Sequence, residues 1–299
     1  MTADWIAVDW GTTHLRAWAM GAEGVRAAAS SDDGMGRLSR DGFEPALIGL
    51  IDSWLGPGVT PIVACGMVGS RQGWHEAPYR TVPCTPLEPD ALSQVPVTDP
   101  RITLQIAPGL KQVSPADVMR GEETQIAGAL SLNPAFDGAV CLPGTHSKWC
   151  RISAGEVVGF QTFLTGELFA LISEHSVLRH GLSSGWDEAA FDAGVAEGML
   201  RPERLPAQLF RLRAEGLIAG LPGDAARARL SGLLIGGELA CARAWWLGLP
   251  IQIVGSDRLS ALYARALAAQ GAHATSLDAT ACTLAGLARA AGPLSKAVQ

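Results

Sequence analysis

The order of predicted strands and helices repeats in the two halves of this chain, and this repeat constrains the fold more than any other feature. Each half begins with three strands joined by short, glycine-containing connections, which predicts an antiparallel meander. A helix, a strand and a further helix follow each meander, with additional helices in the second half. We therefore expect an α/β fold of two domains, each a copy of one βββαβα unit.

The expected bounds follow from period-2 alternation in strands and from three- and four-residue spacing of apolar side chains in helices. Strands are predicted at Trp5–Trp10, 14–20, 24–30, 61–66, 102–107, Gly138–Leu142, 148–153, 157–164, 251–254 and 272–277. Helices are predicted at 43–55, 115–132, 165–175, 187–199, 203–215, 224–247, 257–269 and 279–291. Ser114 is expected to cap the second of these helices, with Pro115 in its first turn. The segment 67–100, rich in Pro and Gly, is expected to be irregular.

Composition argues against several classes of function. The 23 basic and 29 acidic residues give a formal charge of −6 without a run of Lys or Arg, which argues against binding to nucleic acid or to an anionic membrane. No apolar run approaches the roughly 18 residues of a membrane span, and Asp4 and Asp9 lie where a signal peptide would be apolar. The six cysteines lack zinc-ligand spacing and predict reduced thiols in a cytoplasmic protein. The expected partners are a small molecule and, as a default, a second copy in a homodimer.

Two similar turns are the first candidates for chemistry. Asp9 ends an apolar strand before Gly11-Thr12-Thr13, and Gly144-Thr145-His146-Ser147 follows the first strand of the second half. Such turns can direct backbone N–H groups and hydroxyls at phosphate oxygens, while an aspartate can hold hydrated Mg²⁺. An ordinary β-turn is the alternative for either turn alone. Together they suit a nucleoside triphosphate gripped by two domains.

This pair of turns resembles the two phosphate motifs of the sugar kinase, actin and heat-shock chaperone superfamily. Residues 120–129 are similar to its Gly-Asp-Gln segment, which contributes a catalytic acid and the first interdomain connection. Residues 251–256, with Gly255 and Ser256, resemble its adenosine motif. The resemblance implies two ribonuclease H-like domains with an ATP cleft between them: a sugar-binding domain at 1–112 and a nucleotide-binding domain at 113–299. The last helix is expected to pack back against the interdomain connection.

More narrowly, the chain is similar to the 2-dehydro-3-deoxygalactonokinase family over nearly its whole length. The matching segments are DWGTTHLRAW at 9–18, GMVGSRQGWHEAPY at 66–79, MRGEETQ at 119–125, LPGTHSK at 142–148 and FLTGELF at 163–169. The resemblance implies transfer of the γ-phosphate of ATP, with Mg²⁺, to the 6-hydroxyl of 2-dehydro-3-deoxy-D-galactonate in galactonate catabolism. A kinase of another sugar or sugar acid is one alternative, and a non-catalytic nucleotide- or sugar-sensing protein is another.

The resemblance also implies roles for charged residues. The usual catalytic aspartate is replaced by Glu122, which is expected to accept the proton of the attacking hydroxyl. Glu123 is the alternative base, and since adjacent helical residues point about 100° apart, only one should reach the substrate. Phosphates are assigned to Gly11, Thr12, Thr13, Gly144, Thr145, His146 and Ser147, and the metal to Asp9. Lys148 and Arg16 are candidate cations for the charge that develops during transfer, or else solvated charges of hairpins.

An acidic sugar needs a cation, because the protein is negative overall. Arg71 is the first candidate, since guanidinium meets carboxylate with two parallel hydrogen bonds. The neighbouring Trp74, Glu76 and Tyr79 complete the expected acceptor site, and the alternative is that Arg71 stacks on Trp74 as surface structure. Arg120 and Lys111 are weaker candidates for the carboxylate. Glu167 is expected to bind sugar hydroxyls, or else to serve with Thr165 as a residue of a helix first turn.

Overall fold

The computed structural model describes the backbone of residues 2–296 and the side chains of residues 2–292, which form two compact units. The first unit contains the chain up to Phe136, Ser153–Gly159, and the last helix from Ala279. The second contains Asp137–Ile152 and Phe160–Asp278. The helices that begin at Glu122 and Ala279 belong to the first unit, because they pack on the first sheet.

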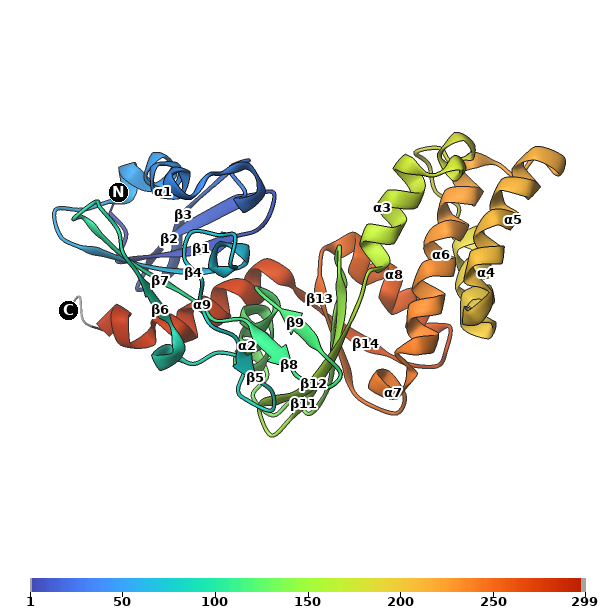
Figure 1. The fold of residues 1–299 in the computed structure, drawn as a ribbon. Helices are drawn as coiled ribbons and strands as arrows, with labels where there is room; N and C mark the ends of the chain where they lie inside the picture. Colours follow the sequence, from blue (N-terminus) through green and yellow to red (C-terminus); the bar gives the residue numbers. More distant parts are fainter. Residues whose placement is uncertain (1, 297–299) are drawn as a thin grey trace. The chain divides into compact units, whose positions relative to one another are not determined.

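The first unit is built on a mixed six-stranded sheet with the strand order β3-β2-β1-β4-β7-β6 (Figure 1). The strands are β1 (Trp5–Trp10), β2 (Leu15–Gly21), β3 (Gly24–Ser31), β4 (Thr60–Cys65), β6 (Ser93–Val95) and β7 (Ile102–Ile106). β1, β2 and β3 form an antiparallel meander, whereas β1, β4 and β7 run parallel. A second, small sheet contains β5 (Arg80–Thr81), β8 (Leu110–Gln112) and β9 (Asp117–Met119).

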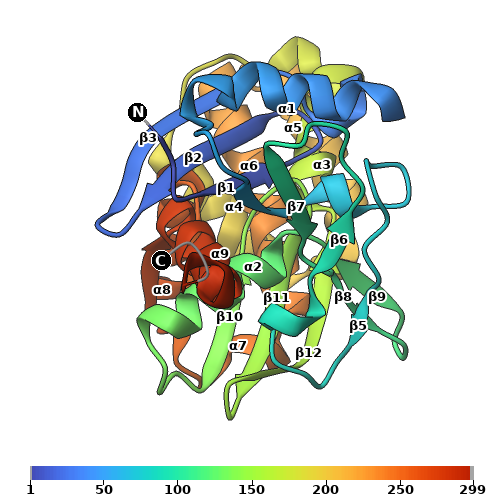
Figure 2. The same cartoon turned by 90° about the vertical axis from the view of Figure 1, so that its left-hand side faces the viewer.

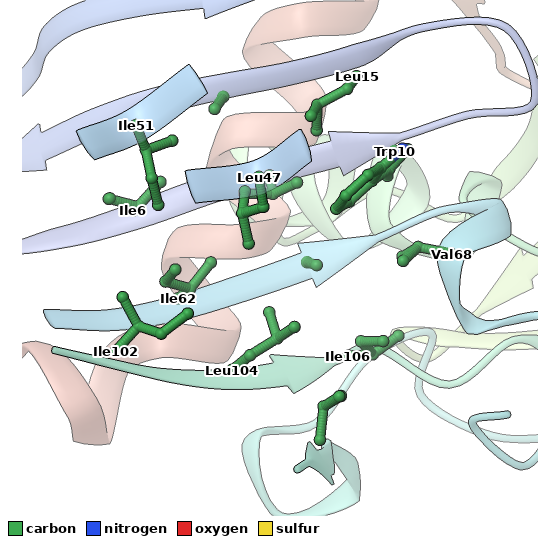
Figure 3. Packing of buried hydrophobic residues seen from close by; sticks show 14 of the residues in the cluster. Ile6, Trp10, Leu15, Leu47, Ile51, Ile62, Val68, Ile102, Leu104 and Ile106 are labelled. Carbon is green, nitrogen blue, oxygen red and sulfur yellow. The ribbon is translucent and has the colours of Figure 1, made fainter. Parts of the chain in front are cut away.

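Both faces of this first sheet are covered by helices, which explains why its central strands β1, β2 and β4 are buried over almost their whole length. In Figure 2, α1 (Phe43–Ile51) crosses one face, and α2 (Glu122–Leu132) and α9 (Ala279–Lys296) lie on the other. Ile6, Val8 and Trp10 of β1 point into the core under α1, as Figure 3 shows for Ile6 and Trp10 beside Leu47 and Ile51. The alternate residues Trp5 and Ala7 join the core formed with α2 and α9.

Glycines allow α2 and α9 to cross with their backbones in contact. A Cβ on Gly128 would lie 1.7 Å from the carbonyl oxygen of Cys282, and one on Gly286 would lie 2.0 Å from that of Thr124. No larger residue fits at either position without moving a helix. α9 thus packs back on α2, whose first turn holds the two candidate glutamates.

The second unit is built on a five-stranded sheet with the order β12-β11-β10-β13-β14, of which only the segment Ser153–Gly159 groups with the first unit. The strands are β10 (Gly138–Leu142), β11 (Ser147–Ser153), β12 (Glu156–Phe163), β13 (Ile251–Gly255) and β14 (Ala274–Asp278). β10 is antiparallel to β11 and parallel to β13, which is parallel to β14. The helices are α3 (Thr165–His175), α4 (Glu188–Leu200), α5 (Leu205–Ile218), α6 (Gly223–Cys241), α7 (Arg243–Trp246) and α8 (Asp257–Ala268). Side chains of α4, α6 and α8 share a core with β10 and β13.

The α/β class with mixed sheets is confirmed, and most expected elements form within one or two residues of their expected bounds. The helix expected from Pro115 is wrong in its first seven residues, because 117–119 pair with 110–112 in a hairpin and the helix begins only at Glu122. The segment 67–100 is not wholly irregular, since it contains β5, β6 and two 3₁₀ turns. The helix expected over 224–247 ends at Cys241, and α7 follows as a separate turn.

Within residues 2–296, none of the helices combines the length and the apolar character needed to cross a bilayer.

Candidate functional site

Asp9 lies near the carboxyl end of β1, directly opposite Arg16 on β2. Arg16 Nη2 donates a hydrogen bond to Asp9 Oδ2. Burial raises the pKa of the Asp9 carboxyl above its usual value, while the charge of Arg16 and this hydrogen bond act in the opposite direction. The predicted metal ligand is therefore already held in place by the predicted cation.

The turn after Asp9 is fixed by backbone hydrogen bonds. Gly11 N donates to His14 O at 3.0 Å, and the amides of Met35 and Gly36 donate to the carbonyls of Gly11 and Thr12. The side chains of Thr12 and Thr13 remain exposed. The turn is consequently rigid in its backbone and open at its hydroxyls.

Glu122 and Glu123 occupy different environments at the start of α2, which Gly121 caps with a φ of 107°. Glu122 is partly exposed, and its Oε2 accepts a hydrogen bond from the Arg120 amide at 3.0 Å. Glu123 is fully buried, where it accepts from the Gly121 amide at 2.7 Å. Burial, with a smaller contribution from the charge of Glu122, raises the pKa of Glu123 to about 8.

A cavity of about 170 Å³ brings the predicted metal ligand and the first-choice base together. It lies at the carboxyl ends of the parallel strands β1 and β4, where open α/β sheets commonly bind ligands. Its lining residues are Asp9, Gly11, Cys65, Gly66, Met67, Arg120, Gly121, Glu122, Gln125 and Thr283. Two carboxylates, an amide and a hydroxyl thus line one polar pocket of the first unit.

The loop 66–79 places its predicted residues in two different settings. Arg71 and Glu76 are exposed. Trp74 packs inward, stacked on Phe43 with 6.1 Å between ring centroids and edge-on to Trp10 at the same distance. Trp74 therefore anchors the loop to the core under α1 rather than to Arg71.

Arg120 contacts the C-terminal end of this loop. Its guanidinium lies 4.3 Å from the centroid of the Tyr79 ring, and its Nη2 donates to Ala77 O at 2.7 Å. The Nε and Nη1 groups of Arg120 are buried without a hydrogen-bond partner among the described residues. Lys111, the other alternative for the carboxylate, is exposed on β8 of the small sheet.

The second predicted phosphate turn, at 144–148, lies against the start of α3. Glu167 N donates to Thr145 O at 2.9 Å, and the Glu167 carboxylate lies 2.6 Å from Nε2 of the exposed His146. A Cβ on Gly166 would lie 2.2 Å from Gly144 O, so the turn and the helix are in backbone contact. Lys148 is buried, and its Nζ donates to His146 O at 3.2 Å. Glu167, expected to bind sugar hydroxyls, thus lies beside the predicted phosphate residues.

A second cavity, of about 230 Å³, adjoins this turn in the second unit. Its lining residues are Gly144, Thr165, Gly166, Phe169, Trp186, Arg227, Ser231, Leu234, Ile235, Arg258, Leu259, Leu262 and Tyr263. The guanidinium of Arg227 lies 5.1 Å from the Phe169 ring centroid, and that of Arg258 lies 5.4 Å from the Trp186 ring centroid. Aromatic walls with two arginines suit a flat aromatic group that carries negative charge.

Gly255 and Ser256 stand at the edge of this second site rather than in its lining. Gly255 ends β13, and a Cβ there would lie 3.0 Å from Cγ of Pro143, which precedes the phosphate turn. Ser256 precedes α8, the helix that contributes Arg258 and Tyr263 to the cavity. The strand end therefore sets the position of the lining helix.

Sequence reasoning missed Glu238, which lies in the buried stretch of α6. Its carboxylate accepts hydrogen bonds from Ser147, Trp149, Thr165 and Tyr263. Burial raises the pKa of Glu238 although these four donors act to lower it. An acidic residue within the otherwise small and apolar run 230–241 was the available signal, because a buried carboxylate needs partners.

Comparison with known protein families gives one match over nearly the whole chain. The model of a family described as 2-keto-3-deoxy-galactonokinase matches residues 9–290. An Escherichia coli (strain K12) protein named 2-dehydro-3-deoxygalactonokinase is 38% identical over 293 residues, which cover 96% of this chain and 97% of that protein. A Rhizobium meliloti (strain 1021) protein assigned the same activity is 41% identical over 293 residues, 95% of either chain.

Solved structures show the same fold. A crystal structure of a Sinorhizobium meliloti protein assigned as a 2-dehydro-3-deoxygalactonokinase superposes with a TM-score of 0.91 at 39% identity, covering 97% of this chain and 99% of that one. The activator of 2-hydroxyisocaproyl-CoA dehydratase from Clostridium difficile, solved with bound ADPNP, superposes with a TM-score of 0.51 at 11% identity over 98% and 96% of the two chains. The second likeness concerns the fold alone.

Proposed function

Because this chain belongs to the 2-keto-3-deoxy-galactonokinase family, we propose that it transfers the γ-phosphate of ATP to the 6-hydroxyl of 2-dehydro-3-deoxy-D-galactonate. Its relatives over more than nine-tenths of its length carry that activity in their names, so the chain is a sugar-acid kinase rather than a sensing protein. The observation that carries the proposed chemistry is the cavity in which Asp9 and Glu122 meet.

In this proposal Glu122 is the general base. Its carboxylate lines the cavity, whereas the carboxylate of Glu123 is fully buried outside the cavity lining and has a raised pKa. A proton acceptor must reach the hydroxyl that it deprotonates, which favours Glu122. Gln125, at the same cavity, offers an amide to a polyhydroxylated acceptor, while the buried Thr283 hydroxyl donates to Ala279 O and accepts from this amide.

The donor set of this cavity fits Mg²⁺, since carboxylate oxygens are the ligands that this ion prefers. Asp9 would hold the ion, with Glu122 as the neighbouring carboxylate. Magnesium, when bound, neutralises charge on the transferred phosphoryl group. Arg16 orients the Asp9 carboxylate and supplies a further positive charge beside it.

We assign the nucleotide to the second unit. Its 230 Å³ cavity has aromatic walls for the base, and the turn containing Gly144, Thr145, His146 and Ser147 lies at its edge for the phosphates. Both sheets also share one arrangement, an antiparallel meander followed by two parallel strands. This supports our proposal that the units are duplicated ribonuclease H-like domains, one for the sugar acid and one for ATP.

We assign the substrate carboxylate to Arg71. This guanidinium is exposed on a loop whose C-terminal half is fixed by Trp74 and by the Arg120–Tyr79 contact. Glu76 is exposed on the same loop and offers an acceptor to sugar hydroxyls. Cytoplasmic localisation and a homodimer stay predictions from the sequence.

The deciding experiment is ADP release from MgATP with 2-dehydro-3-deoxy-D-galactonate, its gluco epimer, galactonate, glucose or no acceptor. We expect the first acceptor to give the highest kcat/KM. Glu122→Gln should lower kcat by about 10²–10⁴-fold, because a positioned base contributes that much, while ADP still binds.

Glu123→Gln is the matched control and should retain far more activity than Glu122→Gln. A smaller loss in Glu122→Gln than in Glu123→Gln would assign the base to Glu123. Turnover on glucose but not on the sugar acids would contradict the proposed substrate.

A further inference from the structure

The carboxylate of Glu238 joins four side chains from three other elements. Its Oε2 accepts from Ser147 Oγ at 2.6 Å and from Tyr263 Oη at 2.7 Å, and also from Thr165 Oγ1. Its Oε1 accepts from Trp149 Nε1 at 2.8 Å. The donors come from β11, α3 and α8, and Glu238 itself comes from α6.

The same elements form the walls of the 230 Å³ cavity. Thr165 of α3 and Tyr263 of α8 line it directly, and α6 lines it through Ser231, Leu234 and Ile235. Ser147 is the last residue of the predicted phosphate turn and the first residue of β11. A single carboxylate therefore joins the turn to three of the surrounding elements.

The buried carboxylate of Glu238 and its four donors depend on one another for hydrogen bonding. Glu238 is 4% exposed, so its charge is tolerated only while the donors stay in place. Conversely, the indole N–H of Trp149 can only donate, so it needs this acceptor. Each element is thus held at a hydrogen-bond distance from the others, and none can shift alone without leaving a buried group unpaired.

We propose that Glu238 is a positioning residue for the nucleotide: it fixes the phosphate turn at 144–147 relative to the cavity walls of α3, α6 and α8. The inference rests on the proposed placement of ATP in the second unit. Glu238 does not line the cavity and makes no direct contact with the nucleotide in this scheme.

The test is the steady-state KM for each substrate in Glu238→Gln, well below the melting temperature of the variant. Glutamine has the same shape, so the fold should persist, but one of its two terminal groups is a donor. With its nitrogen at the Oε1 position the amide faces the indole donor of Trp149, and with its nitrogen at the Oε2 position the hydroxyls of Ser147, Thr165 and Tyr263 lose the acceptor that they share. We expect KM for ATP to rise about tenfold or more, the loss of one hydrogen bond to a charged group, while KM for the sugar acid changes less than about twofold.

Tyr263→Phe provides the second variant, because it removes one donor and leaves the carboxylate. Its KM for ATP should rise less than that of Glu238→Gln, and the double variant should be no worse than Glu238→Gln alone. Full additivity of the two effects would overturn the proposal, since it would mean that the residues act independently.

Two controls separate positioning from general destabilisation. Glu44→Gln alters a carboxylate of the first unit that accepts three hydrogen bonds, against four at Glu238. Leu212→Ala removes buried volume from α5, which contributes no residue to the cavity. Both should leave KM for ATP within about twofold. An equal rise in Leu212→Ala would overturn the proposal by making the effect one of stability.

Arg258→Ala tests the nucleotide site separately from the positioning role of Glu238, because Arg258 lines the cavity itself. If Arg258→Ala raises KM for ATP and Glu238→Gln does not, the result supports the nucleotide site and contradicts the positioning role of Glu238. If neither variant raises it, the assignment of ATP to this cavity falls, and the positioning role with it.

Discussion

Arg16 and Asp9 face each other across β1 and β2, with Nη2 of the arginine donating to Oδ2 of the aspartate. Because burial raises the pKa of Asp9 and Arg16 opposes that rise, removing the arginine should raise the pKa further. We expect Arg16→Gln to move the acidic limb of the kcat/KM–pH profile to higher pH. Arg26→Gln, which breaks the exposed Arg26–Asp4 pair of the same unit, should leave the profile in place. Identical profiles for wild type and Arg16→Gln would contradict this prediction.

The pKa of about 8 at Glu123 predicts how stability changes with pH. Its folded-state pKa lies above the usual value of 4.5, so the folded state binds the proton more tightly than the unfolded state. This contribution to the free energy of unfolding is fully present below about pH 4.5 and is lost as the pH rises through 8. Glu123→Gln should therefore gain in melting temperature, relative to the wild type, with rising pH. Melting curves at pH 5, 7 and 9 measure this, and a constant difference would refute it.

Arg71 provides the test of acceptor charge. Loss of a charge-assisted hydrogen bond of about 1.5–3 kcal/mol should raise KM for the sugar acid about 10–150-fold in Arg71→Ala, with KM for ATP unchanged. The KM of Arg71→Lys for the sugar acid should lie between those of the wild type and Arg71→Ala, because an ammonium group lacks the paired donors of guanidinium. An unchanged KM in Arg71→Ala, together with a rise in Arg120→Gln, would transfer the role to Arg120, whose Nε and Nη1 lack partners among the described residues.

The crossing of α2 and α9 predicts opposite effects for a glycine at the crossing and for a helical glycine away from it. Gly286→Ala would place a Cβ 2.0 Å from Thr124 O, so α2 must shift and carry Glu122 with it. We expect a lower melting temperature and a lower kcat. Gly216→Ala, in α5, meets no atom within 4 Å and should stabilise by up to about 1 kcal/mol through helix propensity. Thermal melts and kcat of both variants decide this, and equal melting temperatures would be evidence against the close crossing.

Local patterns predicted most of the strands and the end of α2 at Leu132. The failure at Pro115 shows the limit of such signals: Ser114 and Pro115 suit a helix start, but residues 117–119 pair with 110–112 instead. That choice depends on a hairpin and on the burial of Met119, which no helix signal contains. The helix begins at Glu122 because Gly121 takes up the positive φ that its start requires.

The role of Glu238 beside the second cavity could not be predicted from the sequence, for a related reason. The partners of Glu238 lie 25 to 91 residues away in the sequence and come from three elements. Spacing rules describe neighbours on one helix or strand. They therefore show that Glu238 is an unusual buried acid, but they do not identify its hydrogen-bond donors. Our proposal of Glu122 over Glu123 as the base likewise rests on the packing of α2, because both residues lie in its first turn.

The loop 66–79 has a fixed base and an exposed tip. Trp74 and Tyr79 hold it to the core and to Arg120, and a Cβ on Gly73 would strike Val68 O at 2.2 Å, so these positions tolerate little change. Arg71 and Gln72 carry no such constraint on packing, since both are exposed. Under our proposal Arg71 binds the acceptor carboxylate, so acceptor preference can be changed at these two adjacent positions without loss of stability, and the tip is the natural place to begin directed evolution toward other sugar acids.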